Sequence, residues 1–274
     1  MAGAGKKWLL GCGLGCGIPV LVVTVVTIVG GARMMKPFDG AIADQKELTA
    51  AYGARDAWTP PVDGLTPDRL ESFLAVRRAL QPQCADFAEL ASKFKRIEDL
   101  EEDGKEPTKG DVFKAVGGLT SAVFGIAGKI GSFTAARNEA LLANGMGLGE
   151  YIWIYTLAYN SDQGHPPNQD FDTGDGGRDF SAKEQRVIRS LMANHADALA
   201  AAGRAEEAAL WRAEIDRLER AETNGVPFPD GALPAEITDQ LAPRRDELAA
   251  LYCAESSAFE FGRVHKRGLS VSSE

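Results

Sequence analysis

An uncharged apolar segment near the N-terminus limits how this chain can fold. No charged residue lies between Lys7 and Arg33, so residues 8–32 are 25 consecutive positions without a charge. A transmembrane helix needs about 20 predominantly apolar residues to cross a hydrocarbon core of roughly 30 Å. Within lipid, a single segment satisfies its backbone polar groups only as a helix. We therefore predict one transmembrane helix at residues 8–32, with the lipid bilayer as a partner of the chain.

The charges around this segment indicate its orientation. Lys6 and Lys7 precede it, and Arg33 follows it, soon joined by Asp39 and Asp44. The positive-inside rule favours the side with more lysine and arginine as the cytoplasmic side. We therefore predict a cytoplasmic N-terminal stub, a location in a bacterial cell membrane, and a body outside the cytoplasm.

Two alternatives to a permanent span stay open. Val29-Gly30-Gly31 resembles the cleavage site of a secretory signal peptide, although the apolar core of such a peptide is usually about 7–15 residues long. Leu9-Leu10-Gly11-Cys12 is similar to a bacterial lipobox, although the strongest apolar stretch follows the cysteine. Within a span, Gly11-x-x-x-Gly15 and Gly13-x-x-x-Gly17 fit the close packing of helix pairs, so a homo-oligomer through these glycines is a further option.

The remainder of the chain is acidic. Four of the 30 basic residues and none of the 39 acidic residues precede position 39, so the rest of the chain has a formal charge of −13. An acidic surface repels nucleic acid and anionic lipid. We therefore exclude nucleic acid as a partner.

Apolar residues recur at helical spacing through most of this acidic part. We predict an all-α fold, in which the N-terminal transmembrane helix is followed by an extracytoplasmic helical bundle. The predicted divisions are a stub and anchor at 1–36, a juxtamembrane helix and linker at 37–64, a helical domain at 65–256, and a disordered tail at 257–274.

Sequence signals indicate where several helices begin or end. Thr66 precedes Pro67, which favours a cap followed by the first helical turn. The apolar stripe that follows includes the charged residue Arg77, and Pro82 is predicted to divide it into two helices. Ser181 and Glu184 have the spacing of a capping box. Residues 148–159 are apolar nearly all round, which favours a helix in the centre of the bundle over a buried strand.

A glycine-rich segment at residues 112–133 carries apolar residues at alternating steps of four and three, as in a coiled-coil seam. Glycine costs up to about 1 kcal/mol relative to alanine within a helix. Close approach of a neighbouring helix would offset that cost. A membrane-inserting segment and a flexible linker are the alternatives.

Two cysteines, Cys84 and Cys253, lie outside the N-terminal segment and far apart in sequence. Outside the cytoplasm such a pair can form a disulfide. Two buried free thiols are the alternative, because buried cysteine behaves as a small apolar residue.

Calcium is the one cofactor for which the sequence offers ligands, and its match is weak. Oxygen-bearing side chains at Asn168, Asp170, Asp172 and Asp179 occupy positions 1, 3, 5 and 12 of a helix–loop–helix calcium site. Position 6 is Thr173, where the sharp turn requires glycine. We find no phosphate loop, dinucleotide fingerprint, nucleophile motif or paired metal-binding histidines, and predict no other cofactor and no catalytic residues.

Three stretches, LTPDRLESFLAVRRAL, GLGEYIWIYTLAY and LAPRRDELAALYC, loosely resemble uncharacterised bacterial membrane-anchored helical envelope proteins. The resemblance implies a tethered helical domain and no known activity. We expect a non-enzymatic interaction or scaffold module with an unknown protein partner. The alternatives are an envelope hydrolase using carboxylates and metal at residues 168–179, and a membrane-active protein using residues 112–133.

Overall fold

The body of the protein is helical, which confirms the predicted all-α class. The computed structural model describes residues 39–102, 128–165, 167, 180–220, 225–229, 231–265 and 268–270. The named helices are α2 (Pro67–Glu102), α4 (Leu148–Tyr155), α5 (Ala182–Ala201), α6 (Ala205–Arg220), α7 (Ala235–Leu241) and α8 (Arg245–Ala250), with the π-helix η1 (Thr156–Asp162) and the 3₁₀ helices η2 (Ala242–Arg244) and η3 (Ala254–Phe259). Residues 39–52 and 128–143 are also helical. The short strands β1 (Arg263–His265) and β2 (Gly268–Ser270) pair antiparallel.

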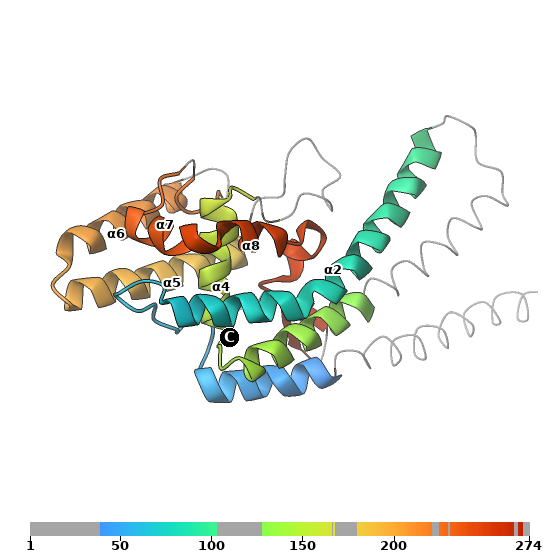
Figure 1. Cartoon of the computed structure of the whole chain (residues 1–274), viewed down its shortest axis with the longest axis horizontal. Coiled ribbons are helices and arrows are strands. Elements are labelled where there is room, and N and C mark those ends of the chain that lie inside the picture. The colour runs from blue at the N-terminus through green and yellow to red at the C-terminus, as the bar shows by residue number, and fades with distance from the viewer. Residues whose placement is uncertain are drawn as a thin grey trace, which may run out of the picture.

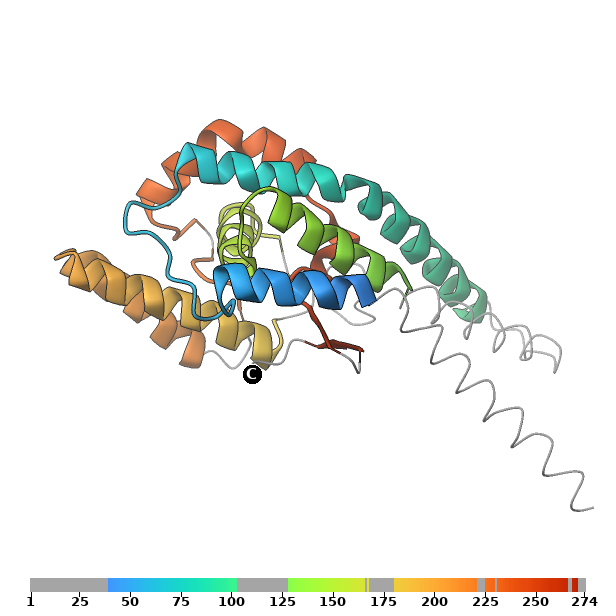
Figure 2. The same ribbon diagram turned by 90° about the horizontal axis from the view of Figure 1, so that it is seen from below.

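Helix α4 occupies the centre of the body. In Figure 2 it is seen almost end-on, with other helices on several sides. Seven of its eight residues are buried, as expected for a segment that is apolar all round. Its start lies against the chain after residue 52, because a Cβ on Gly149 would come within 2.3 Å of the Arg55 carbonyl oxygen. The glycine there permits this approach.

The prediction that Pro82 separates two helices was wrong. Helix α2 is 36 residues long in total and runs through Pro82 without a break. It changes direction along its length, and its far end extends beyond the other helices (Figure 1). Proline removes one backbone hydrogen bond and bends a helix rather than always ending it. Leu80 and Phe87, on either side of the proline, are both fully buried, and this packing favours a continuous helix.

Helices α5 and α6 run side by side in both views (Figures 1 and 2). The predicted capping box is present: the Ser181 hydroxyl accepts from the Glu184 backbone N–H, and the Glu184 carboxylate accepts from the Ser181 backbone N–H. Gly203 follows α5 with φ of +83°, which suits glycine at the turn into α6.

The core does not stop at residues 64 and 256, where the sequence analysis placed boundaries. Leu48 is buried, and the Asn138 side chain donates to the Ala41 carbonyl at 3.1 Å, so the helix at residues 39–52 belongs to the body. Glu260 and Phe261 are also buried, and a strand pair follows them. Residues 257–262 are therefore part of the core and not of a disordered tail.

No helix in the described part of the chain is long and apolar enough to cross a membrane. The predicted span at residues 8–32 lies outside the described residues. So does most of the glycine-rich segment. Of its described end, Phe133 is buried in the core, where its ring meets that of Phe87 edge-on with centroids 5.8 Å apart.

Candidate functional site

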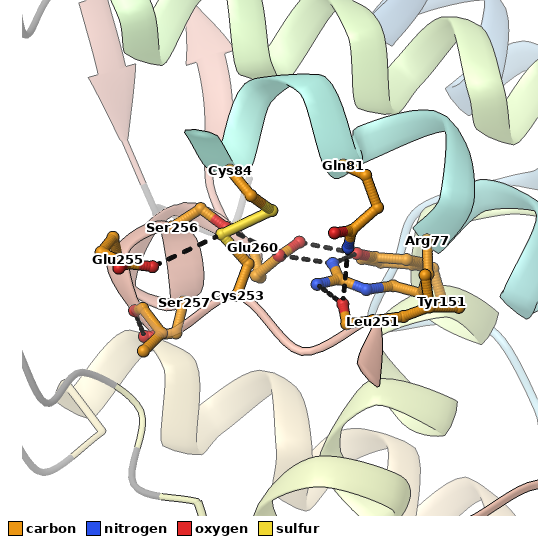
Figure 3. The surroundings of a disulfide bond; sticks show 11 residues. Arg77, Gln81, Cys84, Tyr151, Leu251, Cys253, Glu255, Ser256, Ser257 and Glu260 are labelled. Carbon is orange, nitrogen blue, oxygen red and sulfur yellow. Dashed lines mark hydrogen bonds and ion pairs between the residues drawn. A yellow bond between two sulfur atoms is a disulfide. The ribbon is translucent and has the colours of Figure 1, made fainter. Parts of the chain in front are cut away.

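A buried ionic cluster joins α2, α4 and the chain after α8 (Figure 3). The Arg77 guanidinium donates to Glu260 Oε1 at 2.6 Å and to the Tyr151 hydroxyl at 2.8 Å. The Tyr151 hydroxyl in turn donates to Glu260 Oε2 at 2.6 Å. The side chains of Arg77 and Glu260 have no solvent exposure. The cluster therefore connects three parts of the chain without contacting solvent.

Burial and charge act in opposite directions on Arg77. Burial lowers the pKa of Arg77, and the carboxylate of Glu260 raises it, so that the net shift is upward and the group stays charged. The guanidinium carbon also lies 5.4 Å from the ring centroid of Tyr155 and 5.3 Å from that of Tyr159, within cation–π range. The Tyr155 hydroxyl is buried without a partner among the described residues, and burial raises its pKa well above the usual value.

A second buried arginine binds the same C-terminal segment through its backbone. Arg137 donates to the carbonyl oxygens of Phe259, Glu260 and Gly262 at 3.1, 2.5 and 2.7 Å. Arg55 donates to the carbonyl of Phe261. Because buried cations need hydrogen-bonding partners, these carbonyls make the segment at 259–262 an integral part of the core.

A disulfide between Cys84 and Cys253 links α2 to the chain between α8 and η3, with the two Cα atoms 5.7 Å apart. Just before it, the Leu251 carbonyl accepts from Arg77 at 3.0 Å and from the Gln81 side chain at 3.1 Å. Figure 3 shows the disulfide and the ionic cluster as neighbours under α2. Together they fix the chain directly after α8.

Helix α8 also borders an open pocket of about 510 Å³. The pocket is lined by Asp162, Gln163, His165, Gly231, Leu233, Thr238, Arg245 and Ala249. Its polar residues Asp162, Gln163 and His165 lie at the end of the π-helix η1 and directly after it. The π-helical conformation is often found at functional sites. The Gln163 backbone N–H donates to the Ala158 carbonyl at 3.2 Å, a bond of the π-helical type that holds the pocket residues in place.

Two observations show how firmly this pocket is built. Arg245 donates to the two carboxylate oxygens of Asp162 at 3.1 and 2.7 Å, and the Asp162 side chain is only 4 % exposed. The His165 ring stacks on Tyr252 with centroids 3.8 Å apart and planes 5° from parallel. Burial lowers the pKa of His165, which favours the neutral ring. The pocket therefore combines a fixed ion pair with a neutral aromatic wall.

Two further ionisable side chains, His195 and Glu150, lie apart and have separate partners. His195 lies between Trp153 and Trp211, with ring centroids 5.3 and 4.8 Å away. Glu150, at the start of α4, binds Arg69 through both carboxylate oxygens at 2.6 Å. Within the described residues, no group of three histidine, cysteine, aspartate or glutamate side chains is arranged to hold a metal.

The four candidate calcium ligands, Asn168, Asp170, Asp172 and Asp179, lie outside the described residues. Calcium binding there stays a prediction, which calorimetric titration of calcium into the protein would test. No sequence pattern indicated Glu260 or the pocket. Arg77 did carry a signal, because a charged residue within an apolar stripe implies a buried partner.

Comparison with known proteins adds no relative: the chain matches no family model, no curated protein and no solved structure. What the site can do must therefore be argued from its geometry. The ionic cluster is sealed from solvent and acts as a structural support. The pocket is open, and it is the place where another molecule can enter.

Proposed function

We propose that this protein is a non-catalytic binding module of the bacterial cell envelope, tethered by residues 8–32, with its helical body outside the cytoplasm. The observation that carries the proposal is the Cys84–Cys253 disulfide. Disulfides persist in oxidising compartments and are rare in the cytoplasm. The uncharged segment ahead of the body supplies the tether, and the positive-inside rule agrees with this placement.

Binding fits the open pocket better than catalysis. A general acid or base must reach the proton that it transfers. Asp162 is engaged by Arg245 through both of its oxygens, and His165 is stacked on Tyr252. These side chains are held for recognition. Ala249 lines the pocket. The ionic cluster and the disulfide fix the chain that follows Ala250, and so hold this end of α8 in place.

The test is to produce the full chain in a bacterium and locate its body. We expect the protein in the membrane fraction, released by detergent and not by alkaline carbonate. Protease added to intact spheroplasts should digest the body while a cytoplasmic marker survives. Without reductant, most molecules should have Cys84 and Cys253 protected from alkylation, and reductant should expose both.

A matched control lacks residues 8–32. That variant should appear in the soluble cytoplasmic fraction with both thiols open to alkylation, if the segment is both tether and export signal. The proposal fails if the full chain is recovered without detergent. It also fails if its body is protected from protease in intact spheroplasts and its cysteines are reduced.

A further inference from the structure

The C-terminal segment at residues 254–262, which comprises η3 and the three residues after it, is held largely by other parts of the chain. Each of the four backbone carbonyls at residues 259–262 accepts a hydrogen bond from a buried arginine of another element, either Arg137 or Arg55. Residues 260–262 lie in neither a helix nor a strand. Side chains from elsewhere therefore take the place of a regular backbone hydrogen-bond ladder here.

The side chains of the segment are also bound from outside it. The Phe259 ring stacks on Phe87 of α2 with centroids 5.3 Å apart. Glu260 reaches Arg77 beneath the same helix, beside the disulfide (Figure 3). Because few of its contacts are internal, the segment can leave its place without the helices around it having to unfold first.

Keeping the segment in place has a cost. The Nε atoms of Arg77 and Arg137 are shielded from water and have no hydrogen-bond partner among the described residues. Burial lowers the pKa of Arg137, so its surroundings do not fully replace the water around the cation. Water would solvate both guanidinium groups once the segment had left, which favours opening.

The disulfide is placed to offset this cost. It joins α2 to Cys253, directly before η3, and so keeps the start of the segment against the helix. Cys253 is only 2 % exposed, whereas Cys84 is partly exposed. A thiol reagent therefore approaches the bond from the side of Cys84, and the bond can be reached while the body is folded.

From these contacts we propose that the Cys84–Cys253 disulfide is a redox-controlled latch on residues 254–262. While the bond is intact the segment stays on its buried arginines, and reduction by a dithiol lets the segment leave while α5 and α6 stay folded. This inference goes beyond the proposed binding function and does not depend on the compartment in which the body lies.

The reduction step is ordinary thiol–disulfide exchange. One thiolate of the dithiol attacks a sulfur of the bond and displaces the other cysteine as a thiolate, which takes up a proton. The second thiolate of the dithiol then displaces the remaining cysteine in the same way. Two electrons and two protons pass from the dithiol to the two cysteines, and the dithiol becomes a disulfide.

Hydrogen exchange in native buffer tests the latch. The detergent-solubilised full chain is compared with and without dithiothreitol. We expect exchange of the backbone amides at residues 254–262 to rise by roughly thirtyfold to a thousandfold, which is the typical contribution of a disulfide written as an equilibrium constant. The amides of α5 and α6 should exchange at an unchanged rate.

Arginine modification by phenylglyoxal is the second measurement. Arg77 and Arg137 are 0 % exposed, so both should resist modification in the oxidised chain and react after reduction. Arg212, whose side chain is 53 % exposed, is the internal control and should react equally in both states. The variant Cys84→Ala/Cys253→Ala should behave as the reduced parent does, with or without dithiothreitol.

Three results would overturn the proposal. A purely structural crosslink would lower stability to urea and leave both measurements in native buffer unchanged by reduction. Faster exchange in α5 and α6 by the same factor would mean that the whole body opens. Exchange that rises at residues 254–262 while Arg77 and Arg137 stay unreactive would mean that the segment does not leave the arginines.

Discussion

The core beneath α2 and the core around α5 and α6 are built on different interactions. Beneath α2, the interior contains the charged residues Arg77, Arg137 and Glu260, each at 0 % exposure. Around α5 and α6 it contains aromatic rings, with Trp153 and Trp211 5.1 Å apart between centroids. Apolar packing loses stability in proportion to the area and volume removed. When one residue of a buried ion pair is removed, the other keeps its charge in the interior without a counter-charge, which is strongly destabilising.

The two halves therefore differ in which residues tolerate a single substitution. In the aromatic half, an apolar residue of similar volume is tolerated at modest cost. In the ionic half, the Glu260 carboxylate accepts from both Arg77 and Tyr151, so its loss removes the counter-charge of Arg77 and the acceptor of the Tyr151 hydroxyl together. Comparing substitutions in the two halves is therefore the direct way to test this contrast.

The largest effect should follow from Glu260→Gln. Removing the carboxylate leaves the Arg77 charge uncompensated at 0 % exposure, and breaking one partner of a buried pair costs about 3–5 kcal/mol. Urea unfolding measures the loss. The double variant Arg77→Met/Glu260→Gln should recover much of it, because the buried charge of Arg77 is then removed together with its counter-charge. A loss below about 1 kcal/mol, which is typical of exposed ion pairs, would contradict the claim that the ionic half depends on Glu260.

Removal of the disulfide should come next. The crosslink joins residues separated by 169 positions, and long closures typically contribute about 2–4 kcal/mol. Reductant should lower the free energy of unfolding of the parent by that amount. Cys84→Ala/Cys253→Ala is the control: it should start lower and show no further response to reductant. Equal responses of parent and variant would show that the effect arises elsewhere.

The aromatic half should respond to pH through His195. Burial lowers the pKa of His195 below its ordinary value of 6.5, so the unfolded chain takes up a proton first as pH falls. The stability that neutral His195 supplies is present above pH 6.5 and is lost as pH falls through the folded pKa, by up to about 1.4 kcal/mol per pH unit. His195→Phe should have a smaller loss between pH 7.5 and 5.5, measured by urea unfolding. An unchanged loss would exclude His195.

The smallest effect should come from the surface of the aromatic half. Arg212 donates to Asp197 at 2.9 Å, and the two side chains are 53 % and 76 % exposed. Exposed pairs contribute about 0.2–1 kcal/mol, so Arg212→Gln should stay within that range, and high salt should remove the difference. A larger loss would mean that exposed ion pairs, besides the buried Glu184 and Glu214, also support this half.

Local chemistry explains which parts of the fold were predictable. The capping box of Ser181 and Glu184 and the apolar character of residues 148–159 are determined by neighbours in sequence, and both appear as expected. The helix break predicted at Pro82 is absent, because the burial of Leu80 and Phe87 outweighs the local tendency of proline to end a helix. Local patterns therefore located helices and misplaced one of their ends.

The candidate site depends on contacts that no local pattern contains. Arg77 and Glu260 are 183 positions apart, and Asp162 and Arg245 are 83 apart. Glu260 lies in a stretch without helical periodicity, which is why residues 257–274 read as a tail. An arginine within an apolar stripe indicated that some acid must reach it, and spacing alone could not say which.

The position of Glu260 late in the chain determines when this fold can be completed during synthesis. The ribosome makes α2 and the helix at residues 128–143 long before it makes the residues that bind their buried arginines, Arg77 and Arg137. A nascent chain therefore cannot complete its interior until residues 259–262 have emerged. A polypeptide that waits in this way reaches its native packing late in synthesis and not one helix at a time.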